Sequence, residues 1–279
     1  EEWGPVNEDE PRAGSRHTQA ERAAKYWNAA YTETAHKEWI VAPSEVIQFL
    51  PPSDGRATLD ILEVGCGDSR LGMGVYDFYD EAMGPNAATV TCTDVSLVAI
   101  DRLVALQAAD GSRKRPRLAY RYADATDLRA TFATELFDVV LDKGCADTFQ
   151  FRGRTNETPR LLAMLFKSVA SVLKPGGKLI IVTPKRRIKG LKDSVDWHSV
   201  VRHPLGEASG ALVSNKNSAS AYSVWAWVCT TKPEARGASP VGEGTAVVAG
   251  AAALVSGEEE QQDDHPPIGL RRLRPRPKS

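Results

Sequence analysis

The chain has 279 residues, of which 42% are apolar, which is enough for one α/β domain with a packed core and some spare length. Its 35 Lys and Arg residues and 36 Asp and Glu residues give a formal net charge of −1, so the chain as a whole has no electrostatic attraction to nucleic acid or to an anionic membrane. No apolar run approaches the roughly 20 residues that span a bilayer. We therefore expect neither nucleic acid nor a membrane as a partner.

The four cysteines, Cys66, Cys92, Cys145 and Cys229, lie far apart in the sequence. Their spacing matches no zinc site, so the sequence predicts no metal ion and four reduced thiols. Reduced thiols are typical of a reducing compartment, and we expect a cytoplasmic protein. Because the first residue is not Met, the matrix of a mitochondrion or of another organelle stays open as an alternative.

The N-terminal part is polar and then helical. Residues 1–20 are rich in polar and turn-forming residues, which predicts a flexible arm. A helix is expected from about Gln19 to Tyr31. A second short helix is expected over 44–50, with Ser44 as its N-cap and Pro51 ending it.

From residue 59 onward, strand patterns alternate with helical ones. Apolar or β-branched runs predict strands at 59–65, 89–96, 117–124, 137–144 and 178–184, and helical patterns fill 97–109 and 158–173. The turn residues 174–177 precede the last of these strands. Strands that alternate with helices predict a mostly parallel sheet with helices on both faces.

After residue 184 the pattern changes to two β-rich runs with no helix between them. The runs 195–203 and 221–231 predict an antiparallel hairpin at one edge of the sheet, which gives seven strands in total. Residues 232–279 are rich in Gly, Ala, Pro and charge, and they are expected to form a disordered tail. The predicted folded domain therefore covers 21–231.

A glycine turn lies between the first strand and the next helix, in the sequence EVGCGDSRLG (63–72). Gly65 and Gly67 allow a tight turn and close approach of a ligand. A dinucleotide site requires a third glycine where this chain has Arg70. S-adenosylmethionine carries an ammonium and a carboxylate instead of phosphates, and Glu63 suits that ammonium. The turn therefore favours S-adenosylmethionine as the cofactor.

Acidic residues lie at or near the ends of the following strands. Asp94 is placed to accept hydrogen bonds from both ribose hydroxyls, and Asp124 from the adenine amino group. Asp142 lies at the same edge of the sheet, where the carboxyl ends of the strands meet. Acids also favour turns for purely local reasons. With Glu63, four consecutive parallel strands have an acid at or near the same end. This repetition favours a binding site over four unrelated turns.

These motifs resemble those of the class I S-adenosylmethionine-dependent methyltransferases. LDILEVGCGDSRL (59–71) looks like their first motif, and CTDVS, YADATDL, FDVVLDKG and SVLKPGGKLIIV resemble the later ones in order. The resemblance covers about 22–231 and implies their Rossmann-like seven-stranded sheet. It implies these cofactor-binding residues: Trp27, Glu63, Gly65, Cys66, Gly67, Asp94, Val95, Asp124, Ala125 and Asp142.

A narrower resemblance concerns a branch that methylates protein lysines, including enzymes that act on elongation factor 1A and on citrate synthase. It rests on YWNAAY (26–31), EWI (38–40), GCGDS (65–69) and LDKGCAD (141–147). The last of these departs from the branch by having Cys where Thr is usual. The resemblance implies a protein partner that presents an acceptor lysine.

Two other functions stay open: a small-molecule methyltransferase of the same fold, and a non-catalytic methyltransferase-like subunit of a larger assembly. The lack of a large substrate-binding insertion counts against the first. The intact Glu63, Gly65, Gly67 and Asp94 count against the second.

Methylation of lysine requires loss of the ammonium proton, whose pKa is about 10.4 in water. A carboxylate that orients the ammonium assists this step, and Asp142 and Asp147 are the predicted catalytic residues. Capping of the next helix is the alternative role for both.

Three further groups of residues allow two interpretations. The aromatic residues Tyr26, Trp27, Tyr31 and Trp39 form either a lid over the cofactor or ordinary packing. The basic run 185–189 either meets an acidic partner surface or is a solvated loop. His198 and His203 have no metal-site spacing, and we interpret both as structural.

Overall fold

The computed structural model describes residues 18–34, 36, 38–52, 58–85, 87–151, 158–207 and 223–234. The chain divides into two compact units, Glu1–Arg236 and Gly237–Ser279, and every described residue belongs to the first. Most of the expected N-terminal arm and of the expected C-terminal tail therefore lies outside the described residues.

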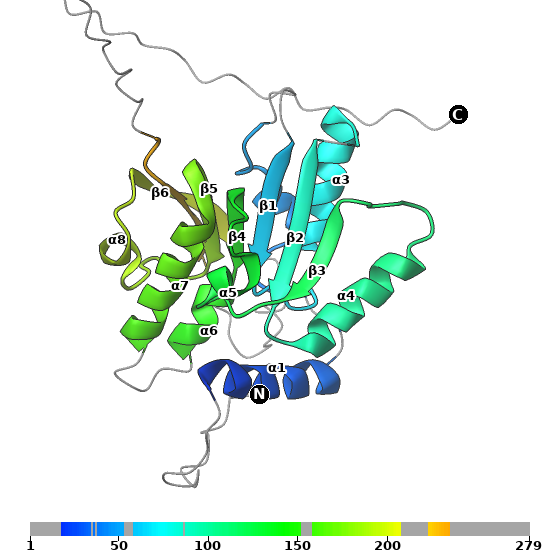
Figure 1. Cartoon of the computed structure of the whole chain (residues 1–279), viewed down its shortest axis with the longest axis horizontal. Coiled ribbons are helices and arrows are strands. Elements are labelled where there is room, and N and C mark those ends of the chain that lie inside the picture. Colours follow the sequence, from blue (N-terminus) through cyan, green and yellow to red (C-terminus); the bar gives the residue numbers. More distant parts are fainter. Residues whose placement is uncertain are drawn as a thin grey trace, which may run out of the picture. The chain divides into compact units, whose positions relative to one another are not determined.

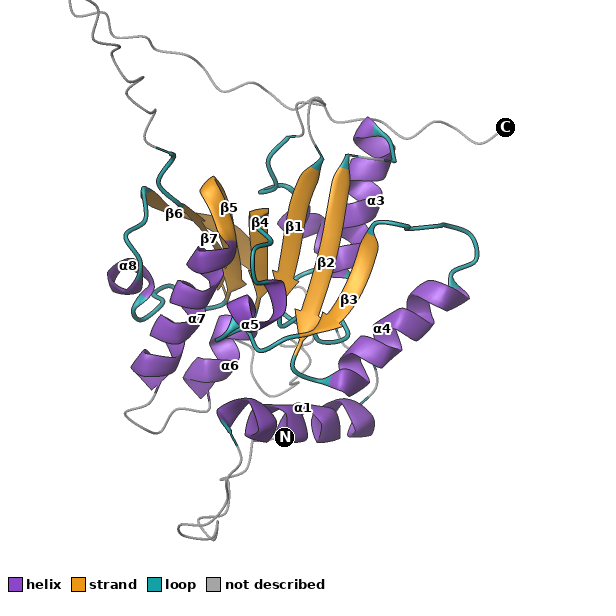
Figure 2. Ribbon diagram, in the orientation of Figure 1, coloured by secondary structure: helices purple, strands orange, loops and turns teal. Residues whose placement is uncertain are grey.

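Seven strands form one sheet in the order β3-β2-β1-β4-β5-β7-β6 (Figures 1 and 2). Strands β1 to β5 run parallel, and β7 is antiparallel to both β5 and β6. This confirms the predicted Rossmann-like sheet with its antiparallel hairpin. The strands are β1 Leu59–Val64, β2 Ala88–Asp94, β3 Leu118–Tyr122, β4 Phe137–Lys143, β5 Leu173–Thr183, β6 Ser199–Glu207 and β7 Ser223–Thr230.

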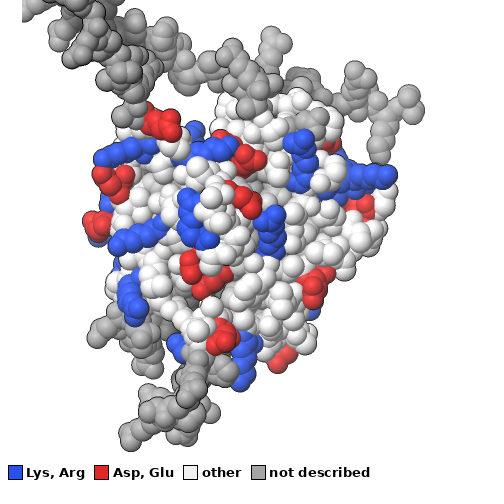
Figure 3. Space-filling model, viewed as in Figure 1, with Lys and Arg blue, Asp and Glu red and all other residues white. Residues whose placement is uncertain are grey.

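Helices cover both faces of the sheet, as expected for parallel strands. The helices of the described residues are α1 Gln19–Glu33, α2 Pro43–Ile47, α3 Leu71–Met83, α4 Leu97–Ala109, α5 Leu128–Phe132, α6 Cys145–Phe151, α7 Thr158–Val172 and α8 Leu191–Ser194. None of these helices is both long enough and apolar enough to cross a bilayer. On the face drawn in Figure 3, basic and acidic side chains are interspersed, which agrees with the balanced composition.

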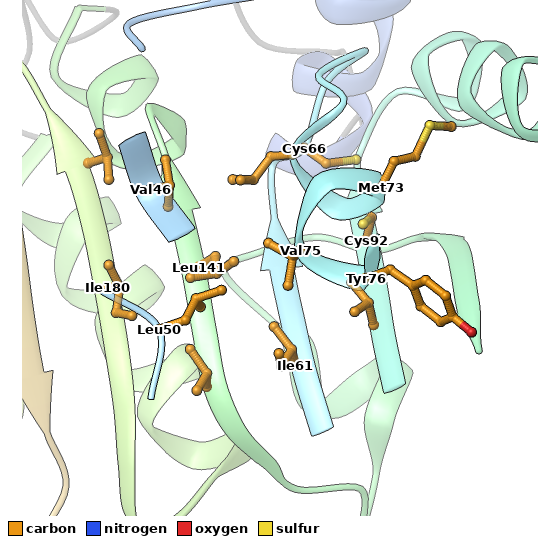
Figure 4. Close-up of a cluster of buried hydrophobic side chains, with 14 of the residues drawn as sticks. Val46, Leu50, Ile61, Cys66, Met73, Val75, Tyr76, Cys92, Leu141 and Ile180 are labelled. Carbon is orange, nitrogen blue, oxygen red and sulfur yellow. The ribbon is translucent and has the colours of Figure 1, made fainter. Parts of the chain in front are cut away.

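The alternation of side chains along each strand creates two apolar clusters, one on each face. Ile61 points into the cluster that α2, α3 and α4 cover, part of which Figure 4 shows. Leu62 points into the cluster that α5, α6 and α7 cover. Because both faces are buried, the parallel strands read as nearly continuous apolar runs in the sequence.

Helix α1 runs across the edge of the sheet at which the arrowheads of β1, β2 and β3 end (Figure 1). Thr18 and Glu21 form a capping box that starts this helix. Asn28 Oδ1 accepts hydrogen bonds from Ser96 Oγ at 2.7 Å and from the backbone N–H of Val98 at 3.3 Å. These bonds fix α1 to the beginning of α4, over the carboxyl ends of the strands.

Two local predictions were wrong. Ser44 is not an N-cap: α2 begins at Pro43 with Ala42 as its cap, because proline is favoured in the first turn of a helix. The turn residues 174–177 lie inside β5 and not before it. Leu173 pairs with Phe137, and pairing resumes at Lys178 opposite Val139, so the Pro-Gly-Gly sequence forms an irregularity within the ladder.

Candidate active site at the carboxyl ends of the strands

The strand register brings the predicted site residues to one edge of the sheet. Val64, the last residue of β1, pairs with Thr93 on β2 and with Asp142 on β4. The glycine turn therefore starts level with the ends of both neighbouring strands. In an open α/β sheet, ligands bind at this edge, outside the carboxyl ends of the strands.

The two glycines of the turn have left-handed backbones, with φ of +61° at Gly65 and +54° at Gly67. A Cβ atom on Gly65 would lie 2.6 Å from Cys145 Sγ, and one on Gly67 would overlap the hydroxyl group of Tyr31. Glycine is thus required at both positions by conformation and by space. The same contacts show that α6 and α1 both touch the turn.

Asp94 ties the glycine turn to the end of β2. Its Oδ2 atom accepts the N–H of Gly67 at 2.8 Å, and Oδ1 accepts the N–H of Ser96 at 2.7 Å. Burial raises the pKa of Asp94 to about 6, although the backbone donors oppose that rise. Each carboxylate oxygen has a second lone pair, so the group can still accept hydrogen bonds from a ligand.

Glu63 is buried behind the turn, where its Oε2 atom would lie 3.3 Å from a Cβ on Gly72. Cys92 hydrogen-bonds this carboxyl group through its thiol, and Oε2 has no nitrogen or oxygen donor among the described residues. Burial raises the pKa of Glu63 to about 8, and the charge of Lys143 opposes the rise. A buried carboxylate oxygen that lacks such a donor and lies beside a glycine turn is suited to an ammonium ligand.

Asp142 caps helix α6. Both of its oxygens accept the N–H of Ala146, at 3.2 and 3.0 Å, and the side chain is almost fully buried. Burial and the charge of Asp147 raise the pKa of Asp142 to about 8. Of the two roles considered from the sequence, helix capping is therefore the one that these contacts describe.

Asp147 lies in the first turn of α6 and is also buried. Its Oδ1 atom accepts a hydrogen bond of 2.7 Å from Thr183 Oγ1 at the end of β5. Its Oδ2 atom has no hydrogen-bond partner among the described residues. Burial raises the pKa of this carboxyl to about 6, against the influence of Thr183 and Lys185. Asp147 thus has one buried carboxylate oxygen to which no described residue donates a hydrogen bond.

The other predicted residues lie in the same set of turns. Asp124 Oδ1 accepts both the N–H and the hydroxyl of Thr126 at 2.8 Å, which closes the turn after β3. Cys66 is buried, and burial raises the pKa of its thiol. The half-buried Val95 and Ala125 follow β2 and β3. The ring of Trp27 lies 5.7 Å from that of Tyr31.

The four aromatic residues near the N-terminus differ in burial and in what they contact. Tyr31 is buried against the glycine turn, and burial together with Asp94 and Asp68 raises the pKa of its phenol. Tyr26 is exposed and contacts Trp27 edge to face, with ring centroids 5.2 Å apart. Trp39 packs against the apolar cluster on the α3 side.

Sequence reasoning missed three polar residues around the turn: Asn28, Glu38 and Lys143. Asn28 lies within YWNAAY, and Glu38 precedes Trp39 in EWI. The aromatic residues of these two motifs are more conspicuous in the sequence than their polar neighbours. Lys143 ends β4, and a lysine at the end of an apolar strand was the available signal that it is buried.

The model of the methyltransferase-domain family matches residues 56–235. An eEF1A lysine and N-terminal methyltransferase homolog of Drosophila melanogaster is 27% identical over 218 residues, which are 74% of this chain and 29% of that protein. The mitochondrial citrate synthase-lysine N-methyltransferase of Danio rerio is 26% identical over 55% of this chain and 63% of its own length. The corresponding enzyme of Pongo abelii is 30% identical over 62% of this chain and 74% of its own length.

A solved structure, the glycopeptide N-methyltransferase MtfA, aligns with a TM-score of 0.47 at 15% identity, over 72% of this chain and 99% of that one. This chain spans less than a third of the length of the insect relative. The family match covers most of the chain and includes the glycine turn and all seven strands. The chain therefore belongs to the methyltransferase-domain family, in the branch that contains these lysine methyltransferases.

Proposed function

We propose that this chain binds S-adenosylmethionine at the carboxyl ends of β1, β2 and β4 and methylates a lysine side chain of a protein. The observation that carries the proposal is the buried carboxylate of Asp147, which has an unpartnered oxygen at the same sheet edge as the glycine turn. The related proteins are named as lysine methyltransferases of eEF1A and of citrate synthase, and these names support a protein lysine as the acceptor.

The residues of the turn fit the cofactor by their chemistry. Glu63 offers a carboxylate oxygen that has no nitrogen or oxygen donor among the described residues to the ammonium of the methionine part. Asp94 offers acceptors to the ribose hydroxyls, and Asp124 to the adenine amino group. When bound, S-adenosylmethionine supplies a methyl group on a positively charged sulfur, which is already a good leaving group.

On the acceptor side, we assign the main role to Asp147. Its free oxygen would accept a hydrogen bond from the lysine ammonium and orient the nitrogen for in-line attack. The site would then have to release one proton to water, which the removal of the ammonium from bulk solvent favours. Asp142 would act indirectly, because its hydrogen bonds hold the beginning of α6 and therefore the position of Asp147.

Transfer of a radiolabelled methyl group into a cell lysate tests this proposal. Label is expected on protein, and mass spectrometry should place it on lysine. Asp147→Asn should abolish most labelling while leaving the affinity for S-adenosylhomocysteine within about threefold of the native value, because the interaction is made at the reacting centre. Asp101→Asn, on the exposed side of α4, is the matched control. Label on a metabolite, or on a residue other than lysine, would show that the proposal is wrong.

A further inference from the structure

An ion pair between the buried Lys143 and the half-buried Glu38 joins strand β4 to the segment that follows α1. Lys143 is only 7% exposed, and its Nζ atom donates to the carboxylate of Glu38 and, at 2.9 Å, to the backbone carbonyl oxygen of Trp39. The two charged residues are 105 positions apart in the sequence. A lysine is buried at this depth only when it is paired and hydrogen-bonded.

Glu38 also contacts the beginning of α3, just after the glycine turn. Its Oε1 atom accepts the hydroxyl of Ser69 at 2.7 Å, and Oε2 accepts the N–H of Arg70 at 3.3 Å. Ser69 Oγ in turn accepts the N–H of Leu71 at 3.1 Å. One carboxylate therefore holds together β4, the N-terminal segment and the start of α3.

This pair differs from the ion pairs of Lys174, which link strands. Lys174 bonds Asp60 and Asp138 at 2.9 and 2.8 Å, but all three side chains are between 29% and 41% exposed. The Lys143 side chain is 3% exposed and that of Glu38 is 22% exposed. Because the desolvation of a buried ammonium group offsets most of its attraction to the carboxylate, an apolar pair of similar size would stabilise the fold about as well. The pair is therefore better explained by the geometry that it imposes.

We propose that Glu38 and Lys143 are positioning residues, which hold the glycine turn and the Trp39 backbone in the arrangement that binds the cofactor. The inference rests on the proposed function, since it concerns the S-adenosylmethionine site. Neither residue has to touch the reacting atoms. Lys143 also acts on Glu63 next to the turn, where its charge opposes the rise in the pKa of that carboxyl.

The test compares Lys143→Met, Glu38→Gln and the double variant, with S-adenosylhomocysteine as the probe. Calorimetry gives its affinity, circular dichroism gives Tm, and hydrogen exchange reports on a peptide that covers 65–72. Lys143→Met alone leaves the half-buried Glu38 carboxylate without a counter-charge, so both Tm and affinity should fall. In the double variant no charge is left unpaired. The Tm of the double variant should return most of the way to the native value. Its affinity for S-adenosylhomocysteine should stay at least tenfold weaker than that of the native protein, and hydrogen exchange over 65–72 should stay faster than in the native protein.

If the two residues had a purely structural role, Tm and affinity would both recover in the double variant. Recovery of Tm without recovery of affinity therefore indicates a positioning role. Glu38→Gln keeps the side-chain volume and one acceptor oxygen, and the same tenfold loss is expected of it. Lys174→Met is the matched control, which should lower Tm without changing affinity by more than twofold. A double variant that binds within twofold of native would overturn this inference alone. A native protein that fails to bind the probe would overturn the proposed function and this inference with it.

Discussion

The Oδ2 atom of Asp94 accepts a hydrogen bond of 2.8 Å from the backbone N–H of Gly67, so the end of β2 and the glycine turn are held as one unit. The proposed ribose acceptor therefore also shapes the loop that receives the rest of the cofactor. A substitution at Asp94 is expected to affect both the contact with the ligand and the turn itself.

Replacement of Asp94 by Ala should weaken the binding of S-adenosylmethionine at least tenfold. The change would remove two charge-assisted hydrogen bonds to the ligand, each worth about 1.5–3 kcal/mol, and it would release the Gly67 N–H. Calorimetry measures the affinity, and Asp101→Ala serves as the control. Unchanged binding by the Asp94→Ala variant would show that this residue does not hold the cofactor.

Replacement of Gly67 by Ala should destabilise the fold, and Tyr31→Phe should relieve part of that loss. The positive φ costs about 1–2 kcal/mol for a residue with a Cβ atom, and the new methyl group would overlap the Tyr31 hydroxyl. With Phe at position 31, the next atom is a ring carbon 3.1 Å away, which requires only a small shift. Urea unfolding of both single variants and the double variant measures the coupling. Additive losses would mean that the two side chains do not meet.

The stability of the protein should depend on pH through Asp142. Its pKa is raised to about 8 in the folded protein, well above its value of about 3.9 in an unfolded chain. The folded state therefore holds the proton more tightly, and the associated stability is complete below about pH 4 and is lost as the pH rises through the folded pKa. In Asp142→Asn the amide oxygen can still accept the Ala146 N–H, but it does not titrate.

The free energy of unfolding of Asp142→Asn should accordingly improve relative to the native protein between pH 5 and pH 8. Urea titrations of both proteins at matched pH values measure this difference, in which contributions from other titrating groups largely cancel. A difference that stays constant over this range would contradict a raised pKa at Asp142.

Local patterns were sufficient to predict the sheet, because each parallel strand is a short apolar run bounded by turns. The helix expected over 97–109 coincides with α4, and the hairpin at 195–231 is present as β6 and β7. The glycine turn was expected at Gly65 and Gly67, and both residues have positive φ.

The polar contacts between distant segments could not be predicted in the same way. Glu38 and Lys143 are charged residues that, judged from their local sequence, belong on a solvated surface. Only the folded chain brings them together, burying Lys143 and half-burying Glu38. Asn28 likewise contacts Ser96 across 68 positions. The two acids of LDKGCAD look equivalent in the sequence, whereas the contacts give Asp142 a capping role and leave Asp147 with a free oxygen.

The basic loop 185–189 is held by its backbone next to Asp147. The Lys185 N–H donates to Thr183 Oγ1 at 3.0 Å, and Arg202, stacked on Trp225 at 4.5 Å, donates to the Arg186 carbonyl oxygen at 3.0 Å. The side chains of Arg186 and Arg187 are exposed. The loop backbone is thus fixed beside the proposed acceptor site, and of its two interpretations we test contact with an acidic substrate surface.

Reversing both charges, Arg186→Glu together with Arg187→Glu, should therefore lower the rate of protein labelling in lysate several-fold and leave the affinity for S-adenosylhomocysteine unchanged. The native rate should fall as salt is raised from about 50 to about 200 mM, since exposed charges are screened over about a Debye length. The reversed variant should lose that dependence. Lys167→Glu, in helix α7, controls for a general effect of charge. Equal labelling by the native and reversed proteins at low salt would show that the loop is merely solvated and that the acceptor protein docks elsewhere on the molecule.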